Sequence, residues 1–335
     1  MKRALITGCA GQDGSLLAEH LLGLGYQVYG LVRRDARGVA WVQSMLGLVE
    51  FLYGDLRDPM SLETAVRKSW PDELYNLGAQ VFVPQSWTRP AETFDVNVGG
   101  LARILEIVEA VRPDIRVYQA TSSEMFGNQD GPCSETTPFC PESPYGASKL
   151  AAHNLVQIYR RKGLYVVSGI CGNHESPRRG LEMVTRKIAR AAARWSLGDE
   201  TPLELGNLDA RRDWGFAGDY VRAMRLMLQQ DQPKDYVIGT GESHSVRDFL
   251  KAACRAAGLA QVPEDRVRID ERLVRKNEIR RLVMDASRAR KELGWEPTVR
   301  FEELVKRMVA SEIESHKKAR VEDSRTVYAR AGGGD

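Results

Sequence analysis

The sequence predicts an α/β protein with a doubly wound parallel sheet and a smaller C-terminal α/β domain. Two observations carry this prediction. Short apolar segments of strand length recur through the first half of the chain at intervals of roughly 25 residues, with segments of helix length between them. The first apolar segment ends in a glycine-rich turn that precedes an amphipathic segment, an order typical of nucleotide-binding sheets.

Composition narrows the class of protein before any motif is considered. The 335 residues are 43% hydrophobic, which is ample for a buried core. With 48 basic and 45 acidic residues the net charge is +3, so composition gives no reason to expect nucleic-acid binding. The five cysteines have no metal-ligand spacing, no apolar stretch reaches the length of a membrane span, and no signal peptide precedes the first strand. We therefore expect a cytoplasmic protein without a bound metal, and no membrane partner.

The first element is a strand over Arg3–Thr7, and a helix is expected over Ser15–Leu24. Glycines spaced as G-x-x-G-x-x-G lie between them, where they let the backbone approach a pyrophosphate at the helix N-terminus. The turn predicts dinucleotide binding. Its expected cofactor contacts are Gly8, Gly11, Gln12, Asp13 and Gly14.

The second strand, Gln27–Val32, indicates which dinucleotide binds. An acidic residue at its end would favour NAD, but the strand runs into Arg33 and Arg34, which suit the 2′-phosphate of NADP. The alternative is that these are two solvated arginines with Asp35 as their local partner.

Further strands are expected over Val49–Tyr53, Glu73–Leu77, Val117–Ala120 and Val166–Ile170. In a doubly wound (Rossmann) sheet, ligands bind at the carboxyl ends of the strands. Residues that follow the strands should therefore line the cofactor, with small side chains allowing close approach after the fourth strand. These residues are Asp55, Leu56, Leu77, Gly78, Ala79 and Gln80.

A serine, a glutamate and a tyrosine–lysine pair follow the strand at Val117–Ala120. Ser143 and Pro144 predict a helix start, because a hydroxyl caps bare amides and proline suits the first helical position. Tyr145 and Lys149 then lie one turn apart, and a nearby ammonium favours the tyrosinate. Such a pair also arises by chance on exposed helices. Ser122 and Glu124 are expected at the same edge as the pair, beside the nicotinamide.

Together these features resemble the extended short-chain dehydrogenase/reductase superfamily, and several longer stretches resemble the GDP-mannose 4,6-dehydratase family. The resemblance extends over about residues 3 to 310. Its most specific segments are Asn173–Gly180 (NHESPRRG) and Arg212–Gly215 (RDWG). It also rests on Thr7–Gly8 with Gly11–Gly14, Arg33–Arg34, Tyr75–Gln80, Tyr118–Ala120 with Ser123–Glu124, Ser143–Gly146, Val184–Ile188, Gly206–Ala210 and Asp219–Val221.

The resemblance implies a mechanism. Tyr145 would take the proton of the sugar 4-hydroxyl while hydride leaves C4 for NADP, and Lys149 would activate it and hold the nicotinamide ribose. Glu124 would be the acid–base residue at C5 and C6, and Ser122 would hydrogen-bond the reacting oxygen. One departure lies here: the family usually reads S-T-S-E, whereas this chain reads T-S-S-E at 121–124, which keeps the hydroxyl but loses a methyl group at Ser122.

The resemblance also implies ligand contacts. His174 and Arg179 would contact NADP, and Ser86 the hexose. Residues that would hold the nucleotide diphosphate and nucleoside of GDP-mannose are Asn173, Val184, Lys187, Arg212, Arg275 and Glu278. The family pattern R-P-x-E-V-D is altered at 275–280, which leaves the base and sugar open.

The expected cofactor domain is 1–171 with about 208–256. The expected nucleotide-sugar domain is 172–207 with 257–316, and a polar tail follows at 317–335. Family members use a segment like 35–41 to reach a neighbouring subunit, which implies a homodimer or homotetramer. Besides a dehydratase of GDP-mannose, the alternatives are a dehydratase of another GDP-hexose or heptose, a 4-epimerase or 4-reductase, and a non-catalytic NADP-binding regulator.

Overall fold

The structure, a computed structural model, describes residues 1–274 and 277–331. Its chain forms two compact units. The first unit comprises Met1–His174, Arg212–Ser243 and Asn277–Thr298. The second comprises Glu175–Arg211, His244–Lys276 and Val299–Asp335. Arg275, one of the expected nucleoside contacts, lies outside the described residues.

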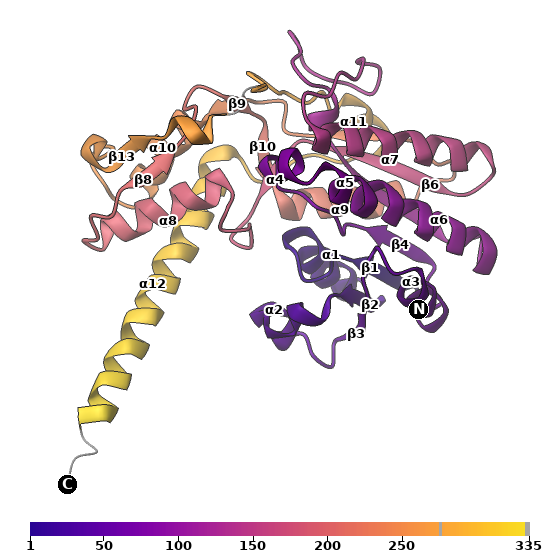
Figure 1. Cartoon of the computed structure of the whole chain (residues 1–335), viewed down its shortest axis with the longest axis horizontal. Coiled ribbons are helices and arrows are strands. Elements are labelled where there is room, and N and C mark those ends of the chain that lie inside the picture. The colour runs from indigo at the N-terminus through magenta and orange to yellow at the C-terminus, as the bar shows by residue number, and fades with distance from the viewer. Residues whose placement is uncertain (275–276, 332–335) are drawn as a thin grey trace. The chain divides into compact units, whose positions relative to one another are not determined.

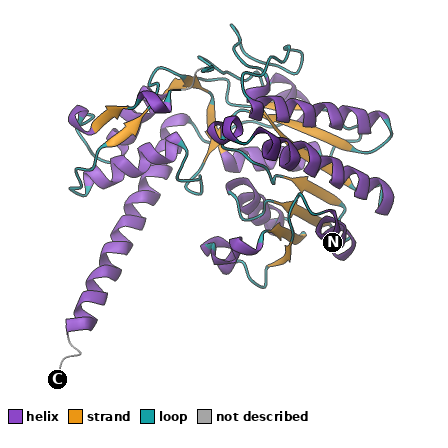
Figure 2. Cartoon of the chain, viewed as in Figure 1, coloured by secondary structure: helices purple, strands orange, loops and turns teal. Residues whose placement is uncertain are grey.

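The first unit is built on one parallel sheet, as the sequence predicts (Figures 1 and 2). Within the described residues the sheet has seven strands in the order β11-β6-β5-β4-β1-β2-β3, and every pairing is parallel. The order changes direction between β1 and β4, the kind of position at which such sheets bind ligands. The strands are β1 (Arg3–Thr7), β2 (Gln27–Val32), β3 (Val49–Tyr53), β4 (Glu73–Asn76), β5 (Arg116–Ser122), β6 (Val166–Cys171) and β11 (Tyr236–Ile238).

Alternating side chains of these strands divide the core of the first unit into two layers. Ala4 and Ile6 of β1 pack with α1, α9 and α11, whereas Leu5 packs with α3, α6 and α7 on the opposite face. These helices are α1 (Gln12–Gly23), α3 (Pro59–Ser69), α6 (Gly100–Val111), α7 (Pro144–Arg161), α9 (Ala217–Met227) and α11 (Ser287–Leu293). Shorter elements of the unit are η1 (Arg34–Gly38), α2 (Ala40–Ser44), α4 (Val83–Thr88), α5 (Pro90–Phe94), η2 (Asp95–Gly99), η3 (Ser123–Met125) and β10 (Trp214–Phe216).

The second unit has a core of three helices and a small sheet. Buried residues such as Ile188, Phe249 and Leu304 come from α8, α10 and α12, which pack against one another. The elements are α8 (Val184–Ser196), β8 (Leu203–Leu205), β12 (His244–Ser245), α10 (Val246–Ala256), η4 (Glu264–Arg266), β13 (Val267–Ile269), η5 (Glu271–Leu273) and α12 (Phe301–Ala331), with β8 parallel to β13. Two short strands, β7 (Asn173–Glu175) and β9 (Arg211–Arg212), cross positions where the units divide.

The unit boundaries differ most from the expected domain ranges at residues 244–256 and 277–298. Residues 244–256 group with the second unit, because α10 packs on α8 and α12. Residues 277–298 group with the sheet, because Ala289 and Leu293 of α11 belong to its core. The tail expected from residue 317 is helical as far as Ala331, since the sequence there has helix-forming residues and no glycine or proline before Gly332. Which unit binds which ligand stays a prediction.

Candidate active site

The glycine turn is compact because its glycines lie where other residues would not fit. A Cβ on Gly14 would come within 2.4 Å of the Gly8 carbonyl oxygen, so only glycine permits this packing. Helix α1 begins at Gln12, inside the glycine motif and three residues before the expected Ser15, with Gly11 as its N-cap. Since glycine has no side chain to cap the helix, this N-terminus suits an anionic ligand.

Thr7 joins the ends of β1 and β4. Its hydroxyl donates to Asn76 Oδ1 at 2.6 Å and accepts the amide hydrogens of Leu77 at 3.1 Å and Gly78 at 3.0 Å. The expected strip Leu77–Gln80 therefore lies beside the glycine turn at the carboxyl edge of the sheet.

Asn97 connects this strip to α7, a role that the sequence analysis missed. Its Oδ1 accepts the Gln80 amide hydrogen at 2.9 Å, and its Nδ2 donates to Ser148 Oγ at 3.0 Å. Ser148 in turn donates to the Tyr145 carbonyl oxygen at 2.7 Å. The signal that could have found Asn97 is an amide on the buried side of an otherwise apolar helical segment.

The catalytic residues predicted from sequence lie together at this edge. Ser143 caps α7 by accepting the Gly146 amide hydrogen at 3.0 Å, and Pro144 occupies the first helical position. Lys149 Nζ lies 5.8 Å from the centroid of the Tyr145 ring and donates to the Ala120 carbonyl oxygen at 3.0 Å. Burial lowers the pKa of the Lys149 ammonium to about 8.

Glu124 lies next to the start of α7. A Cβ on Gly146 would be 2.7 Å from the Glu124 carbonyl oxygen, so the first turn of the helix rests directly on the backbone of Glu124. Ser122 Oγ accepts the Glu124 amide hydrogen at 3.2 Å, which fixes the short η3 helix. Tyr145 and Glu124 are buried residues, with 8% and 9% of their surface exposed.

His174 binds the glycine turn. Its Nε2 lies 2.8 Å from Asp13 Oδ2, its Nδ1 lies 2.7 Å from the Gly172 carbonyl oxygen, and its ring stacks on Tyr220. Gln12 Nε2 donates to the His174 carbonyl oxygen at 3.1 Å. Sequence reasoning expected His174 to contact the cofactor, and the structure places it beside two of the expected cofactor residues.

Of the two arginines after β2, Arg33 has the local partner that the alternative interpretation expects. Arg33 Nη2 lies 3.3 Å from Asp35 Oδ2, and both side chains are exposed. Asp55 accepts hydrogen bonds from Arg57, which lowers the pKa of its carboxyl group.

Comparison with known proteins identifies the family. The model of the family described as GDP-mannose 4,6 dehydratase matches residues 5–308. GDP-mannose 4,6 dehydratase 1 of Arabidopsis thaliana is 49% identical over 334 residues, covering 96% of this chain and 92% of its own length. The chain belongs to the GDP-mannose 4,6-dehydratase family.

Other relatives agree with this membership of the GDP-mannose 4,6-dehydratase family. The GDP-mannose 4,6 dehydratase of Homo sapiens is 43% identical over 339 residues, covering 93% of this chain and 91% of its own length. Among solved structures, the UDP-glucose 4-epimerase of Thermus thermophilus in complex with NAD has a TM-score of 0.80 at 28% identity, covering 92% of this chain and 98% of that one. The fold class and the resemblance inferred from sequence are thereby confirmed.

Not every residue expected from the dehydratase family lies in the first unit. Arg179, Val184 and Lys187 belong to the second unit, where Arg179 Nε lies 3.1 Å from the buried Glu175 carboxylate. Val184 and Lys187 lie in the first turn of α8. Their ligand contacts stay predictions.

Four further family positions lie in the first unit. Arg212 pairs with Glu278 at 3.2 Å and donates to the Ile279 carbonyl oxygen at 2.7 Å, so two expected nucleotide contacts meet. Asn173 lies in β7, two residues after β6. Ser86 is buried and donates to the Val83 carbonyl oxygen at 2.7 Å.

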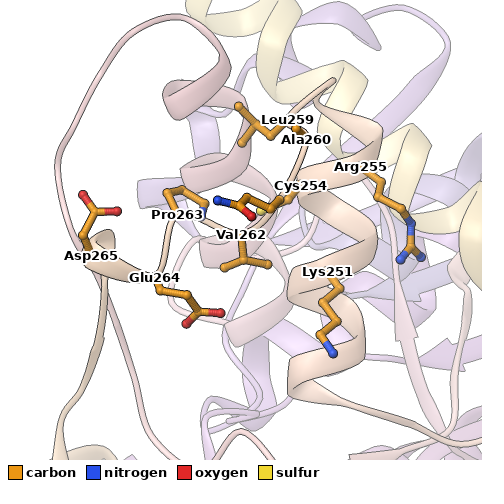
Figure 3. A pocket seen from close by; sticks show the side chains of 10 residues that line it. Lys251, Cys254, Arg255, Leu259, Ala260, Val262, Pro263, Glu264 and Asp265 are labelled. Atoms are coloured by element: carbon orange, nitrogen blue, oxygen red, sulfur yellow. The ribbon is translucent and has the colours of Figure 1, made fainter.

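A cavity of about 520 Å³ lies in the second unit, between α10 and the loop that follows it (Figure 3). Lys251, Cys254 and Arg255 of α10 line one side, and Val262 and Glu264 the other. The residues that dehydratase membership points to are absent from its lining.

Over 1–274 and 277–331, no helix has the length and apolar composition needed to cross a bilayer. Across the same ranges, three or more His, Cys, Asp or Glu side chains do not converge as they would around a metal ion.

Proposed function

We propose that this protein converts GDP-D-mannose to GDP-4-keto-6-deoxy-D-mannose with loss of water, using NADP that is recycled within each turnover. The observation that supports the proposal is the contact between the Glu124 carbonyl oxygen and the first turn of α7, the turn that carries Tyr145. A simple oxidoreductase needs the tyrosine but not the carboxylate. The names of the Arabidopsis and human relatives support the reaction and substrate.

The residues present suit a nicotinamide dinucleotide. Gln80 Oε1 is buried and has no hydrogen-bond partner among the described residues, as expected for an acceptor that a ligand donor completes. The uncapped start of α1 suits a pyrophosphate, and the Thermus relative was solved with NAD. When bound, the nicotinamide would supply reversible acceptance of a hydride.

Tyr145 acts first in this scheme. As the phenolate, its side chain takes the proton of the sugar 4-hydroxyl while that carbon is oxidised to a ketone. Lys149 lowers the cost of the tyrosinate by its positive charge, and Ser122 hydrogen-bonds the reacting oxygen. The hydrogen bond from Lys149 to Ala120 holds the ammonium near the ring.

Glu124 then acts as base and as acid. The new 4-ketone acidifies the neighbouring C5 proton, which the Glu124 carboxylate removes. The protonated carboxyl group returns that proton to the C6 hydroxyl, which leaves as water. One residue serves both steps because the proton gained in the first is the proton given in the second.

NADP rather than NAD rests on Arg33 and Arg34, whose guanidinium groups suit a 2′-phosphate. We assign further cofactor contacts to His174 and Arg179. Substrate contacts are assigned to Ser86, Asn173, Val184, Lys187, Arg212, Arg275 and Glu278. Five free cysteines support a cytoplasmic enzyme. By analogy with its family we propose a homodimer or homotetramer.

The likeness to a UDP-glucose 4-epimerase favours a second candidate, a nucleotide-sugar 4-epimerase or 4-reductase. Neither reaction requires an acid–base group at C5 and C6, so the role of Glu124 discriminates. The altered 275–280 segment keeps open a dehydratase of another GDP-hexose or heptose.

The test uses GDP-mannose deuterated at C4, incubated with the purified protein without added cofactor. Mass spectrometry of the product should show loss of one water with the deuterium recovered at C6. The Glu124→Gln variant should release no water. Epimerised sugar, or a requirement for added NADPH, would overturn the dehydratase in favour of the second candidate. Full dehydration by Glu124→Gln would remove Glu124 from the mechanism.

A further inference from the structure

We propose that Thr121, Ser168 and His153 form a directional hydrogen-bond chain that positions Ser122 at the end of β5, and Glu124 in the η3 helix that follows, against Tyr145 of α7. The proposal concerns positioning residues, which contact neither substrate nor cofactor. It rests on the proposed function, because it assigns these residues to the alignment of Ser122 and Glu124 with Tyr145.

The direction of the chain follows from which atoms can donate. Thr121 Oγ1 lies 2.9 Å from the Gly169 carbonyl oxygen, which only accepts, so the one hydroxyl proton of Thr121 points there. Thr121 Oγ1 must therefore accept from Ser168 Oγ at 2.8 Å. Ser168 has then used its own proton and accepts from His153 Nδ1 at 2.9 Å.

The last contact of the hydrogen-bond chain determines the protonation state and tautomer of the His153 imidazole. His153 Nε2 lies 2.9 Å from Nε2 of the Gln157 side chain, a nitrogen that only donates. His153 is therefore neutral, with its proton on Nδ1.

The surroundings of the ring agree with a neutral imidazole. The ring is buried and packs edge-on against Phe139, and this burial lowers the pKa of His153. Two charged groups face it: Asp235 raises the pKa and Arg160 lowers it. These two side chains pair with each other, and Asp235 also accepts the Ser168 amide hydrogen at 2.8 Å.

The chain belongs to a polar stripe on α7. Tyr145, Lys149, His153 and Gln157 are spaced by four, so they follow one side of the helix. Lys149 is hydrogen-bonded to Ala120, and His153 reaches the next β5 residue, Thr121, through Ser168. Two successive residues of β5 are thus tied to α7 directly before Ser122.

Thr121 stands where the family's S-T-S-E pattern has serine, so this departure puts a threonine hydroxyl into the hydrogen-bond chain. Its branched β-carbon restricts χ1 and holds the hydroxyl toward Gly169 and Ser168. Serine at this position keeps both hydrogen bonds and loses only the restriction. Valine keeps the shape of threonine and removes the hydroxyl, which makes the two substitutions a matched pair.

The first test is NMR of the full chain labelled with ¹⁵N-histidine. The His153 signal, identified by its loss in His153→Asn, should show a neutral ring protonated on Nδ1 at pH 7. A cationic ring, or a proton on Nε2, would overturn the chain as drawn. This measurement requires no substrate, so it stands even if GDP-mannose is not turned over and the proposed function fails.

The second test compares kcat and KM for GDP-mannose at a temperature well below unfolding. Thr121→Val should lower kcat about tenfold and leave KM within about twofold, because misplacement of reacting groups affects chemistry more than binding. Thr121→Ser should stay within about twofold of the wild type. The kcat of His153→Asn, which keeps a hydrogen-bond donor near the position of Nδ1, should be higher than the kcat of His153→Phe. A lower Tm for Thr121→Val with wild-type kcat would mean that the hydrogen-bond chain only stabilises the fold and does not position the reacting groups, which would overturn the proposal.

Discussion

At the scale of single residues, Lys149 combines a charge with nearly complete burial. Its pKa is lowered from 10.5 to about 8 because burial disfavours the ammonium. The shift corresponds to a cost of about 3 kcal/mol below pH 8, where the folded chain still carries the charge. The hydrogen bond from the ammonium to the Ala120 carbonyl oxygen offsets part of this cost.

Lys149→Met should therefore stabilise the protein by about 1–2 kcal/mol at pH 7 while abolishing turnover. Between pH 8 and 10.5 the unfolded wild type binds more protons than the folded one, so wild-type stability rises with pH and the difference between the proteins shrinks. Urea unfolding at pH 7 and pH 10 measures this. The exposed Lys162 at the end of the same helix is the control, and Lys162→Met should change stability by less than about 0.5 kcal/mol. A destabilised Lys149→Met at pH 7 would contradict the cost assigned to burial.

Tyr145→Phe removes only the phenolic oxygen. Since general acid–base groups contribute about 10²- to 10⁴-fold, turnover should fall by about 10³-fold. Dinucleotide released on denaturation should match the wild type, because the ring remains in place. Wild-type turnover in this variant would assign the 4-hydroxyl proton to another base.

The proposed preference for NADP is tested at Arg33. Arg33→Ala should weaken NADP binding by about 10- to 100-fold, as expected for one charge-assisted hydrogen bond, and leave NAD within about twofold. Asp35→Ala is the control, because an exposed ion pair contributes little. Isothermal titration of both dinucleotides gives the result. Equal weakening for NADP and NAD would mean that no 2′-phosphate is recognised here.

At the scale of elements, the start of α7 should affect both the stability of the protein and its turnover. Ser143 caps the helix two residues before Tyr145, so Ser143→Ala should cost about 1 kcal/mol of stability and also lower kcat. Ser245 caps α10 in the second unit with the same geometry, accepting the Asp248 amide hydrogen at 3.0 Å. Ser245→Ala should cost a similar amount of stability without changing kcat. Thermal unfolding with steady-state kinetics separates the two, and equal kinetic effects would dismiss any special role of the α7 cap.

Local signals predicted the elements that hold the site. Strands β2 and β3 have the expected bounds and α7 begins where Ser143 and Pro144 indicate, because hydrophobic pattern and helix caps act over a few residues. The η2 helix at Asp95–Gly99, which carries Asn97, was not predicted, since its hydrogen-bond pattern has no distinct sequence signature. The partners of His174 were missed for a related reason: Asp13 lies 161 positions away along the chain.

At the scale of the whole molecule, the division into units could not be predicted from composition. The chain enters and leaves the first unit repeatedly, and residues 277–298 return to it after a segment of the second. Which segments belong to which unit is determined by packing between segments that are distant in the sequence, such as α11 on the core of the sheet. Boundaries between discontinuous units are therefore the part of the fold that local pattern reveals least.

The proposed oligomer also belongs to the scale of the whole molecule. Leu46 and Leu48, between α2 and β3, are 59% and 62% exposed, close to the 35–41 segment expected to reach a neighbouring subunit. Neighbouring exposed apolar side chains of this kind mark contact surfaces. Light scattering should therefore give a mass that is two or four times the 37.5 kDa of one chain.

The double substitution Leu46→Lys with Leu48→Lys should lower that mass, because two buried ammonium groups oppose association. Met60→Lys is the matched control, since Met60 is 73% exposed at the start of α3 and outside the expected contact. A single-chain mass for the wild type would refute the oligomer. An unchanged mass for the double variant would place the contact on another surface, because a contact through Leu46 and Leu48 would not survive both charges.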